Sequence, residues 1–151
     1  MMLNNDVKRP ALRLGIFQTP PEQTVAAVDC AIASWYRLID TAAAYFNERQ
    51  VGEEIVRSGI DRSEIFVTTK LWISDYGYER ALRAFDASLR KLGLDYVDRY
   101  LLHWPVPSDF EAAAVVFPIA REGGSAENGC SVNRASVCSR LIIRIMKETS
   151  R

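Results

Sequence analysis

Four polar residues from three separate segments of the chain could together donate a proton. Asp40, Lys70 and His103, the only histidine of the chain, each stand at the downstream end of a short apolar, β-branched run. Tyr45 lies in the segment that follows the first of these runs. The carboxyl ends of parallel strands meet on one face of an α/β barrel, and the active sites of such barrels lie on that face. We therefore expect the four side chains to meet on that face.

Each of the four residues also has an ordinary structural interpretation. Asp40 could cap a turn, Tyr45 could be a surface aromatic residue, and His103 could be a hydrogen-bonded core histidine. Lys70 is harder to explain in this way, because lysine is seldom buried without a partner and Asp40 would be a natural one. Their joint placement at one end of a single fold favours a site over four separate explanations.

The elements that must position these residues alternate between strands and helices. Apolar and β-branched runs predict strands at Leu12–Phe17, Tyr36–Asp40, Ile65–Thr69 and Tyr96–Leu102. The segments between them predict helices from Thr19 to about Ser34, from Asn47 to Gly59 and from about Tyr78 to Leu92. Alternation at this spacing is typical of βα units in a parallel sheet.

Local signals mark the ends of the predicted helices. Thr19 and Glu22 have the spacing of a capping box, with Thr19 as N-cap and a proline at the first helical position. Asn47 can cap the second helix, and Gly59 and Gly93 can stop the second and third. Apolar stripes are formed by Val51, Ile55 and Val56 in the second helix and by Leu82, Phe85, Leu89 and Leu92 in the third.

Two α/β folds are built from such units, the (β/α)₈ barrel and the doubly wound open sheet. The open sheet usually carries a glycine-rich phosphate loop after an early strand. Neither G-x-G-x-x-G nor G-x-x-x-x-G-K-[ST] occurs in this chain. We therefore predict a partial (β/α)₈ TIM barrel of about the first four βα units, followed by an irregular or helical tail.

Several segments resemble the aldo-keto reductase family, and its bacterial diketogluconate reductase-like group in particular. The similar segments lie within roughly residues 8–111 and read RLIDTAAAYFNERQVGEEI, EIFVTTKLW, GYERALRAFDASLRKLGLDYVD and YLLHWP. The resemblance implies a (β/α)₈ barrel that uses NADPH to reduce aldehydes and ketones, with a small carbonyl compound as substrate. It also implies a catalytic tetrad formed by Asp40, Tyr45, Lys70 and His103.

The implied mechanism assigns a role to each member of the tetrad. A hydride passes from the nicotinamide to the carbonyl carbon, and Tyr45 gives a proton to the developing alkoxide. Since a phenol is a weak acid at neutral pH, a nearby Lys70 ammonium would help by stabilising the phenolate. Asp40 would hold Lys70 charged and in place, and His103 would orient the carbonyl oxygen.

The resemblance also suggests binding residues. Phe17, Trp72 and Trp104 would wall an apolar substrate pocket, although ordinary packing explains these aromatic residues equally well. The residues that would contact NADPH are Gly15, Ile16 and Asp40. In the family the later strands and loops hold most of the cofactor, and no matching residues are found in this chain. We therefore expect weak or no NADPH binding.

Two residues and the tail depart from the family pattern. Trp35 stands where the family has a helix-ending glycine, whose left-handed conformation does not suit tryptophan. Arg99 stands where an apolar, barrel-filling residue is usual, and strand alternation puts it on the same face as His103. From about Ala112 the resemblance ends. We divide the chain into residues 1–111, the N-terminal half of such a barrel, and residues 112–151, a divergent tail.

The tail permits several interpretations. It reads as disordered or as one helix, with an apolar face formed by Val137, Leu141, Ile142 and Ile145. A basic amphipathic helix of this kind can lie on membranes but more often packs on its own domain. A truncation or a shifted reading frame would explain the abrupt loss of resemblance.

Composition limits the partners and the location. The chain has 151 residues, with 19 basic and 19 acidic ones, so its formal net charge of zero gives no reason to expect nucleic acid. No apolar run approaches the roughly 20 residues of a membrane helix, and the N-terminus lacks a signal-peptide core. An odd cysteine count of 3 then favours reduced thiols in the cytoplasm. One histidine and no C-x-x-C argue against a metal site.

Three functions remain open on this basis. The first is an NADPH-dependent aldo-keto reductase. The second is a truncated, catalytically inactive half-barrel that keeps the tetrad but cannot bind cofactor. The third is a non-catalytic module that self-associates through the open sheet edges that four strands would leave.

Overall fold

The computed structural model describes residues 9–104 and 131–133 of the chain. Parallel strands alternate with helices along the first of these ranges. The elements are β1 (Leu14–Gly15), α1 (Pro21–Ala33), β2 (Leu38–Asp40), the 3₁₀ helix η1 (Ala43–Tyr45), α2 (Glu48–Arg57), η2 (Arg62–Glu64), β3 (Phe66–Leu71), η3 (Ile73–Asp75), α3 (Tyr78–Leu92), β4 (Arg99–Leu102) and β5 (Ser131–Asn133).

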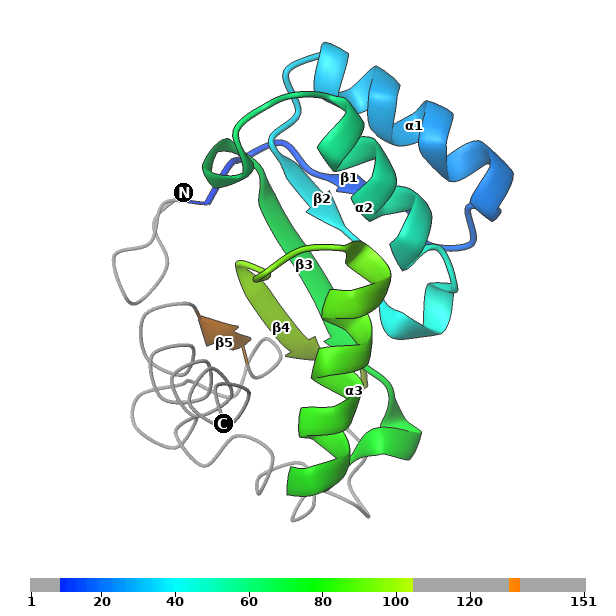
Figure 1. Cartoon of the computed structure of the whole chain (residues 1–151), viewed down its shortest axis with the longest axis vertical. Helices are drawn as coiled ribbons and strands as arrows, with labels where there is room; N and C mark the ends of the chain where they lie inside the picture. Colours follow the sequence, from blue (N-terminus) through cyan, green and yellow to red (C-terminus); the bar gives the residue numbers. More distant parts are fainter. Residues whose placement is uncertain (1–8, 105–130, 134–151) are drawn as a thin grey trace.

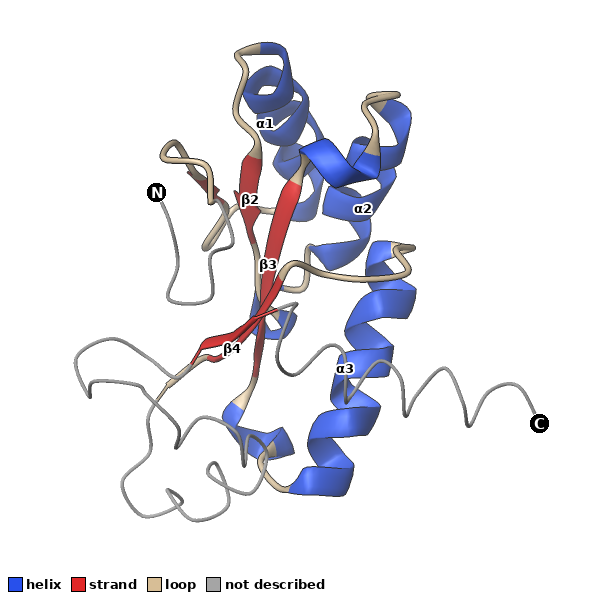
Figure 2. Cartoon of the chain, turned by 90° about the vertical axis from the view of Figure 1, so that its left-hand side faces the viewer, coloured by secondary structure: helices blue, strands red, loops and turns tan. Residues whose placement is uncertain are grey.

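The strands form one sheet in the order β1-β2-β3-β4-β5, with β1 to β4 parallel. The three α-helices lie together on one face of this sheet (Figures 1 and 2). Sequential parallel strands with crossover helices on one face are the βα units of a (β/α)₈ barrel. The predicted α/β architecture is therefore confirmed, although each strand is shorter than the apolar run that predicted it or is shifted along it.

One edge of the sheet differs from the expectation of two open edges and an irregular or helical tail. Ser131–Asn133 pairs antiparallel with residues Arg99–Leu101 of β4. The prediction of an open edge at β4 is therefore wrong, because this pairing occupies backbone groups that an edge strand would expose. The predicted apolar face of a tail helix, at residues 137–145, lies outside the described residues.

The two faces of the sheet carry different side chains, because residues alternate along each strand. Strand residues of the buried core include Ile39, Val67, Leu71 and Tyr100. Helix residues in the same core include Val28, Ile32, Val51, Ile55, Ala81, Phe85 and Leu92. Asp40 and Lys70 fall at the alternate positions and thus on the face turned away from the helices.

The start of α1 corrects the predicted capping box. Pro20, not Thr19, is the N-cap, and no side chain makes a capping hydrogen bond there. The second of two consecutive prolines begins the helix, because it has no N–H that would need a partner. The hydroxyl of Thr24 donates over 3.0 Å to the carbonyl of Pro20, which already accepts the backbone N–H of Thr24, so it replaces no missing cap.

The C-terminal ends of α2 and α3 agree with the prediction, whereas their buried stripes agree with it only in part. Gly59 and Gly93 have φ angles of 68° and 63°, the left-handed conformation that stops a helix. Val56 is 66% exposed, so its placement in the apolar stripe of α2 is wrong. The buried stripe of α3 is Ala81, Phe85, Ser88 and Leu92, which leaves the predicted Leu82 and Leu89 at its margins.

α2 and α3 pack closely because Gly52 has no side chain. A Cβ atom at this position would lie 1.7 Å from the carbonyl oxygen of Leu92. The backbone of α3 therefore fills the place of a side chain on α2. This approach sets the distance between the two helices that follow the strands carrying Asp40 and Lys70.

A largely buried ion pair joins η2 to the residue before β4. The guanidinium of Arg62 lies 2.7 Å from the carboxylate of Asp98 and donates to the carbonyl of Tyr96. The same Asp98 oxygen accepts from the backbone N–H of Val67 over 2.9 Å. These bonds hold the start of β4 beside β3 and thereby align the two strands that lead to Lys70 and His103.

Trp35 takes the conformation that the family pattern reserves for glycine. Its φ angle is 65°, and its side chain is exposed at the end of α1. The guanidinium of Arg37 lies 5.1 Å from the ring centroid of Trp35 and donates to the carbonyl of Ile32 over 3.0 Å. This stacking offsets part of the conformational cost.

Candidate active site

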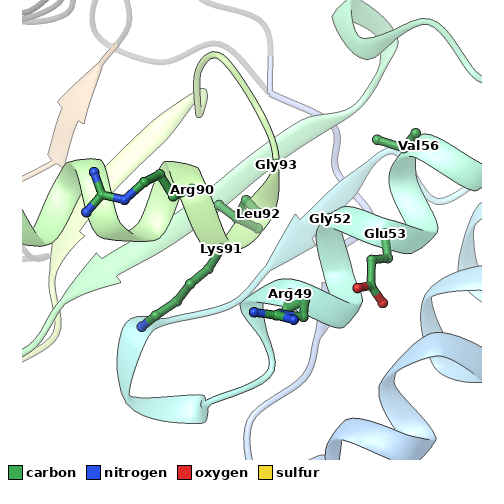
Figure 3. Close-up of a pocket in the computed structure, with 8 residues that line it drawn as sticks. All are labelled: Arg49, Gly52, Glu53, Val56, Arg90, Lys91, Leu92 and Gly93. Atoms are coloured by element: carbon green, nitrogen blue, oxygen red, sulfur yellow. The ribbon is translucent and has the colours of Figure 1, made fainter.

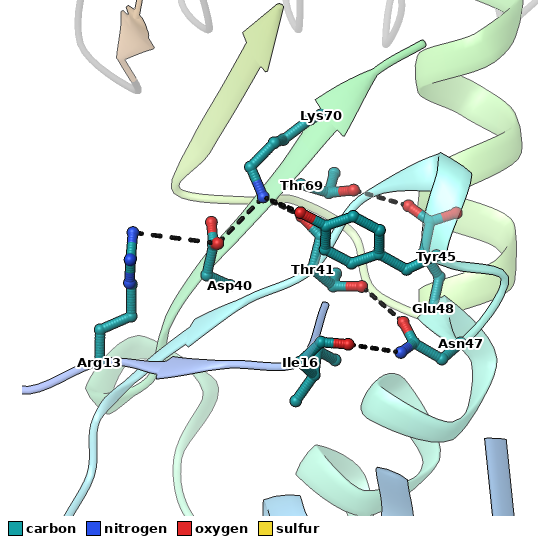
Figure 4. A network of polar contacts seen from close by, with 9 residues as sticks. All are labelled: Arg13, Ile16, Asp40, Thr41, Tyr45, Asn47, Glu48, Thr69 and Lys70. Atoms are coloured by element: carbon teal, nitrogen blue, oxygen red, sulfur yellow. Dashed lines mark hydrogen bonds and ion pairs between the residues drawn. The ribbon is translucent and has the colours of Figure 1, made fainter. Parts of the chain in front are cut away.

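The four predicted site residues lie together at the carboxyl ends of the strands. Asp40 is the last residue of β2, Lys70 is the next-to-last residue of β3, and His103 directly follows β4. Tyr45 ends η1, in the connection between β2 and α2. The carboxyl ends of three strands and the connection after β2 thus bring the four side chains to one end of the sheet, as the sequence predicts (Figure 4 shows three of them).

Lys70 is at the centre of the polar contacts. Its Nζ donates to Asp40 Oδ2 over 2.9 Å, to the carbonyl of Thr41 over 3.0 Å and to Tyr45 Oη over 3.3 Å. These partners match the three N–H bonds of an ammonium group. The side chains of Lys70 and Asp40 are only 14% and 12% exposed, so solvent screens the pair weakly. The phenol oxygen of Tyr45 accepts from Lys70, which leaves its own O–H available to donate elsewhere.

His103 stands among aromatic rings. The centroids of Trp72 and Tyr45 lie 5.0 and 5.3 Å from that of His103 in edge-to-face geometry, and Trp104 stacks at 6.0 Å. Burial lowers the pKa of His103 from its ordinary value of 6.5, the Lys70 charge lowers it further, and Asp40 opposes both. The imidazole is therefore neutral near pH 7. Its Nδ1 is buried and has no hydrogen-bond partner among the described residues.

The three predicted pocket residues border the tetrad. Phe17 packs against Tyr45 with ring centroids 5.2 Å apart, and the hydroxyl of Tyr76 donates to the backbone carbonyl of Trp104. Phe17 and Trp104 are 62% and 59% exposed. These two exposed rings are therefore not packed in the buried core, and their role as pocket walls stays a prediction.

The residues predicted to contact a cofactor differ in how accessible they are. Gly15 pairs in register with Asp40, and nothing lies within 4 Å of where its Cβ would be. The side chain of Ile16 is buried in the core. Its N–H donates to the Asp40 carbonyl, and its own carbonyl accepts from Asn47. The open surface beside Asp40 is thus provided by Gly15 and not by Ile16.

Two arginines lie on the same face as Asp40. Arg13 Nη1 is 4.0 Å from Asp40 Oδ2. Arg99 pairs in register with Thr68, which itself pairs with Asp40, so the three residues form a row across the sheet. Burial lowers the pKa of Arg99, the Arg9 charge lowers it further, and Asp40 raises it. The expected inward position of Arg99 therefore agrees with the structure, whereas sequence reasoning did not include Arg13 in the site.

The polar residues at the start of α2 were also missed as part of the site. Asn47 accepts a hydrogen bond from the Thr41 hydroxyl over 2.9 Å. Glu48 is buried, and its Oε1 accepts from the hydroxyl of Thr69, the neighbour of Lys70 (Figure 4). The segment TAAAYFNE, which leads from β2 to these residues, offered no clear signal, because polar residues at a helix start ordinarily indicate a cap.

A separate hollow lies between α2 and α3, away from the tetrad (Figure 3). It has a volume of about 460 Å³ and is lined by Arg49, Gly52, Glu53, Val56, Arg90, Lys91, Leu92 and Gly93. None of its lining residues belongs to the tetrad or to the aromatic group beside it. Within residues 9–104 and 131–133, we find neither a cluster of metal-ligating side chains nor a helix able to cross a membrane.

Comparison with known proteins decides the family. A model of the Aldo/keto reductase family matches residues 11–147. The chain belongs to this family. The match continues past residue 111, while the division into residues 1–111 and 112–151 stays a prediction.

Individual relatives match most of this chain, whereas this chain matches less than half of each relative. Over an alignment of 103 residues, the chain is 68% identical to the morphine 6-dehydrogenase of Pseudomonas putida. This alignment covers 68% of this chain and 35% of that protein. An aldo/keto reductase structure from Brucella melitensis matches with a TM-score of 0.73 and 48% identity, over 78% of this chain and 46% of that one. The Bombyx mori aldo-keto reductase in complex with NADP matches with a TM-score of 0.72 and 36% identity, over 80% and 46%. The chain thus spans less than half the length of each relative.

Proposed function

We propose that the site reduces aldehydes or ketones to alcohols, with NADPH as hydride donor and Tyr45 as proton donor. The observation that carries this proposal is the position of the Lys70 ammonium, 3.3 Å from the phenol oxygen of Tyr45 and 2.9 Å from Asp40. A cation beside a phenol stabilises the phenolate left after proton donation. Relatives named as a morphine 6-dehydrogenase and as a 9,11-endoperoxide prostaglandin H2 reductase support an oxidation–reduction reaction in general.

Each residue of the tetrad has a separate task in this reaction. Tyr45 receives a hydrogen bond from Lys70 and directs its own O–H toward the substrate oxygen. Asp40 holds the Lys70 ammonium in place through their 2.9 Å ion pair. His103, neutral near pH 7 and lacking a partner at Nδ1 among the described residues, can hydrogen-bond the carbonyl oxygen.

The substrate pocket is formed by the aromatic residues beside the tetrad. Phe17, Trp72 and Trp104 present apolar ring surface next to Tyr45 and His103. Such a surface favours apolar or aromatic carbonyl compounds, because burial of apolar area stabilises the complex by about 25 cal/mol per Å². The polar tetrad then recognises the carbonyl oxygen.

NADPH suits the open surface beside Asp40. The open space at Gly15, the register partner of Asp40, leaves room for a ring to approach that end of the strands. When bound, NADPH supplies the hydride. The Bombyx mori relative was solved in complex with NADP, which supports this choice of cofactor. Within residues 9–104, Gly15 and Asp40 remain as proposed cofactor contacts, because the side chain of Ile16 is buried and its N–H and carbonyl are hydrogen-bonded within the chain. We therefore expect weak binding.

The proposal is tested by supplying both reactants to the purified chain. NADPH is titrated while its fluorescence is followed, and an aromatic aldehyde is then added while nicotinamide absorbance is recorded. We expect weak, saturable binding and aldehyde-dependent oxidation of NADPH. A chain that binds no NADPH, or that binds it without reducing the aldehyde, would contradict the proposal.

A second candidate function is self-association through the sheet. Among the described strands, β1 pairs only with β2, so its other edge is free to accept a strand from a second copy. Gel filtration over a range of concentrations would detect this association. A clean monomer at high concentration counts against it.

A further inference from the structure

We propose that Asn47 is a positioning residue that holds Tyr45 and Phe17 in their reactive arrangement. This inference rests on the proposed function, because it assigns those two rings to proton donation and substrate contact. The side-chain hydrogen bonds of Asn47 go to Ile16, Thr19 and Thr41 and not to a member of the tetrad. Asn47 acts through the two loops that carry Phe17 and Tyr45 (Figure 4).

The carboxamide of Asn47 is fully buried and joins both loops. Its Nδ2 donates to the carbonyl of Ile16 over 3.1 Å and to that of Thr19 over 3.2 Å. Its Oδ1 accepts from the Thr41 hydroxyl over 2.9 Å. Because two carbonyls can only accept, they also fix which end of the amide faces them. The amide therefore connects the loop after β1 to the loop after β2.

The two bonded carbonyls enclose the turn that presents Phe17. Ile16 and Thr19 lie on either side of Phe17 and Gln18, and the N–H of Thr19 donates to the Ile16 carbonyl over 3.2 Å. Asn47 thus closes this turn from the side of α2. The Phe17 ring, which contacts Tyr45 at 5.2 Å, is presented by a turn that the amide holds at both ends.

Unfavourable backbone conformations on both loops show that something must hold them. Gln18, which follows Phe17, has a φ angle of 56°, and Phe46, which follows Tyr45, has one of 57°. Neither is glycine, and such conformations persist only where the surroundings impose them. Asn47 directly follows Phe46 and bonds to both sides of Gln18, so a single side chain restrains both strained positions.

The same side chain also supports the position of Lys70. Thr41 gives its hydroxyl to Asn47 and accepts from Lys70 Nζ at its backbone carbonyl over 3.0 Å. Asn47 occupies the N-cap position of α2 yet makes no capping hydrogen bond with its side chain. An N-cap side chain commonly accepts a hydrogen bond from a backbone N–H of the first helical turn. The Asn47 amide makes no such bond, and its hydrogen bonds go to the two site loops instead.

Two substitutions test separately the bonds of Asn47 to the loop after β1 and its bond to the loop after β2. Asn47→Asp keeps an acceptor for Thr41 but turns a carboxylate toward the carbonyls of Ile16 and Thr19, so the Phe17 turn is released. Thr41→Val removes only the hydroxyl that donates to Asn47. Ser88→Ala is the matched control, because Ser88 is also buried, and its hydroxyl has no hydrogen-bond partner among the described residues.

Two readouts are recorded for each folded variant. The first is the nuclear Overhauser contact between the Phe17 and Tyr45 rings, which needs no turnover. The second is kcat and KM for NADPH-dependent reduction of an aromatic aldehyde. In Asn47→Asp we expect the ring contact to disappear and kcat to fall about 10- to 100-fold with a smaller change in KM, as for misplaced reacting groups. Thr41→Val should show a smaller loss and Ser88→Ala none.

The outcomes distinguish this inference from the proposed function. An unreactive wild-type chain whose ring contact is lost in Asn47→Asp supports the positioning role and contradicts the function. A reactive wild-type chain whose ring contact and kcat survive in Asn47→Asp overturns the positioning role alone. If Asn47→Asp does not fold, Thr41→Val decides by the same two readouts, and an unchanged kcat and ring contact there overturn the proposal.

Discussion

Replacement of Gly52 by alanine should destabilise the protein, although helix propensity alone predicts the opposite. Alanine is favoured over glycine inside a helix by about 1 kcal/mol. At this position, however, a Cβ would lie 1.7 Å from the carbonyl oxygen of Leu92 and 2.4 Å from its carbonyl carbon. Non-bonded atoms settle at about 3.5 Å, so α2 and α3 would have to move apart by about 1.8 Å at this contact. The clash is with backbone, which cannot rotate away.

The expected cost follows from these two opposing effects. Overpacking costs about 3 kcal/mol when the neighbour cannot adjust, and the propensity gain of about 1 kcal/mol leaves a net loss of about 2 kcal/mol. Urea denaturation should show a lower midpoint with an unchanged slope.

Gly59→Ala is the control for the Gly52 substitution. Gly59 has a φ of 68° with nothing within 4 Å of its Cβ position, so it should lose only about 1 kcal/mol from conformation. A Gly52→Ala chain that is as stable as the wild type would refute the close packing of α2 and α3.

Two further predictions concern charged groups. Asp98→Ala should lower the free energy of unfolding by about 3–5 kcal/mol, because it leaves the Arg62 guanidinium buried without its carboxylate; thermal and urea unfolding would measure this loss, and a loss below about 1 kcal/mol would contradict it. His103 should make stability depend on pH: its pKa in the folded chain lies below the ordinary 6.5, so the unfolded chain binds the proton more readily and stability falls as pH drops from above 6.5 through the folded pKa. In His103→Asn this part of the decline should vanish, and an identical pH profile of unfolding in both chains would show that His103 does not contribute.

The sequence predicted the ends of elements correctly where a residue at the boundary itself fixes that end. The end of α3 at Leu92 and the left-handed Gly93 follow from glycine chemistry alone. The start of α1 was missed because two adjacent prolines shifted the helix by one residue, past Thr19. The pairing of β5 with β4 was also missed, since contacts between residues distant in sequence leave no local pattern.

The candidate site shows the same division. The residue types and strand-end positions of Asp40, Lys70 and His103 were enough to predict that they meet. The structure adds what spacing cannot give, which is the distance from Lys70 to Tyr45. The role of Asn47 could not be predicted, because its position at a helix start suggests an ordinary cap, whereas its amide donates to carbonyls 31 and 28 residues earlier in the chain.

The central claim is that Tyr45 donates the proton in carbonyl reduction, and Tyr45→Phe tests it most directly. The substitution removes one hydroxyl and keeps the ring that contacts Phe17 and His103. Aldehyde-dependent oxidation of NADPH is measured in both chains, and NADPH binding is measured by fluorescence. We expect the rate to fall by about 10²- to 10⁴-fold while NADPH binding is unchanged. A Tyr45→Phe chain that reduces the aldehyde as fast as the wild type would contradict the account.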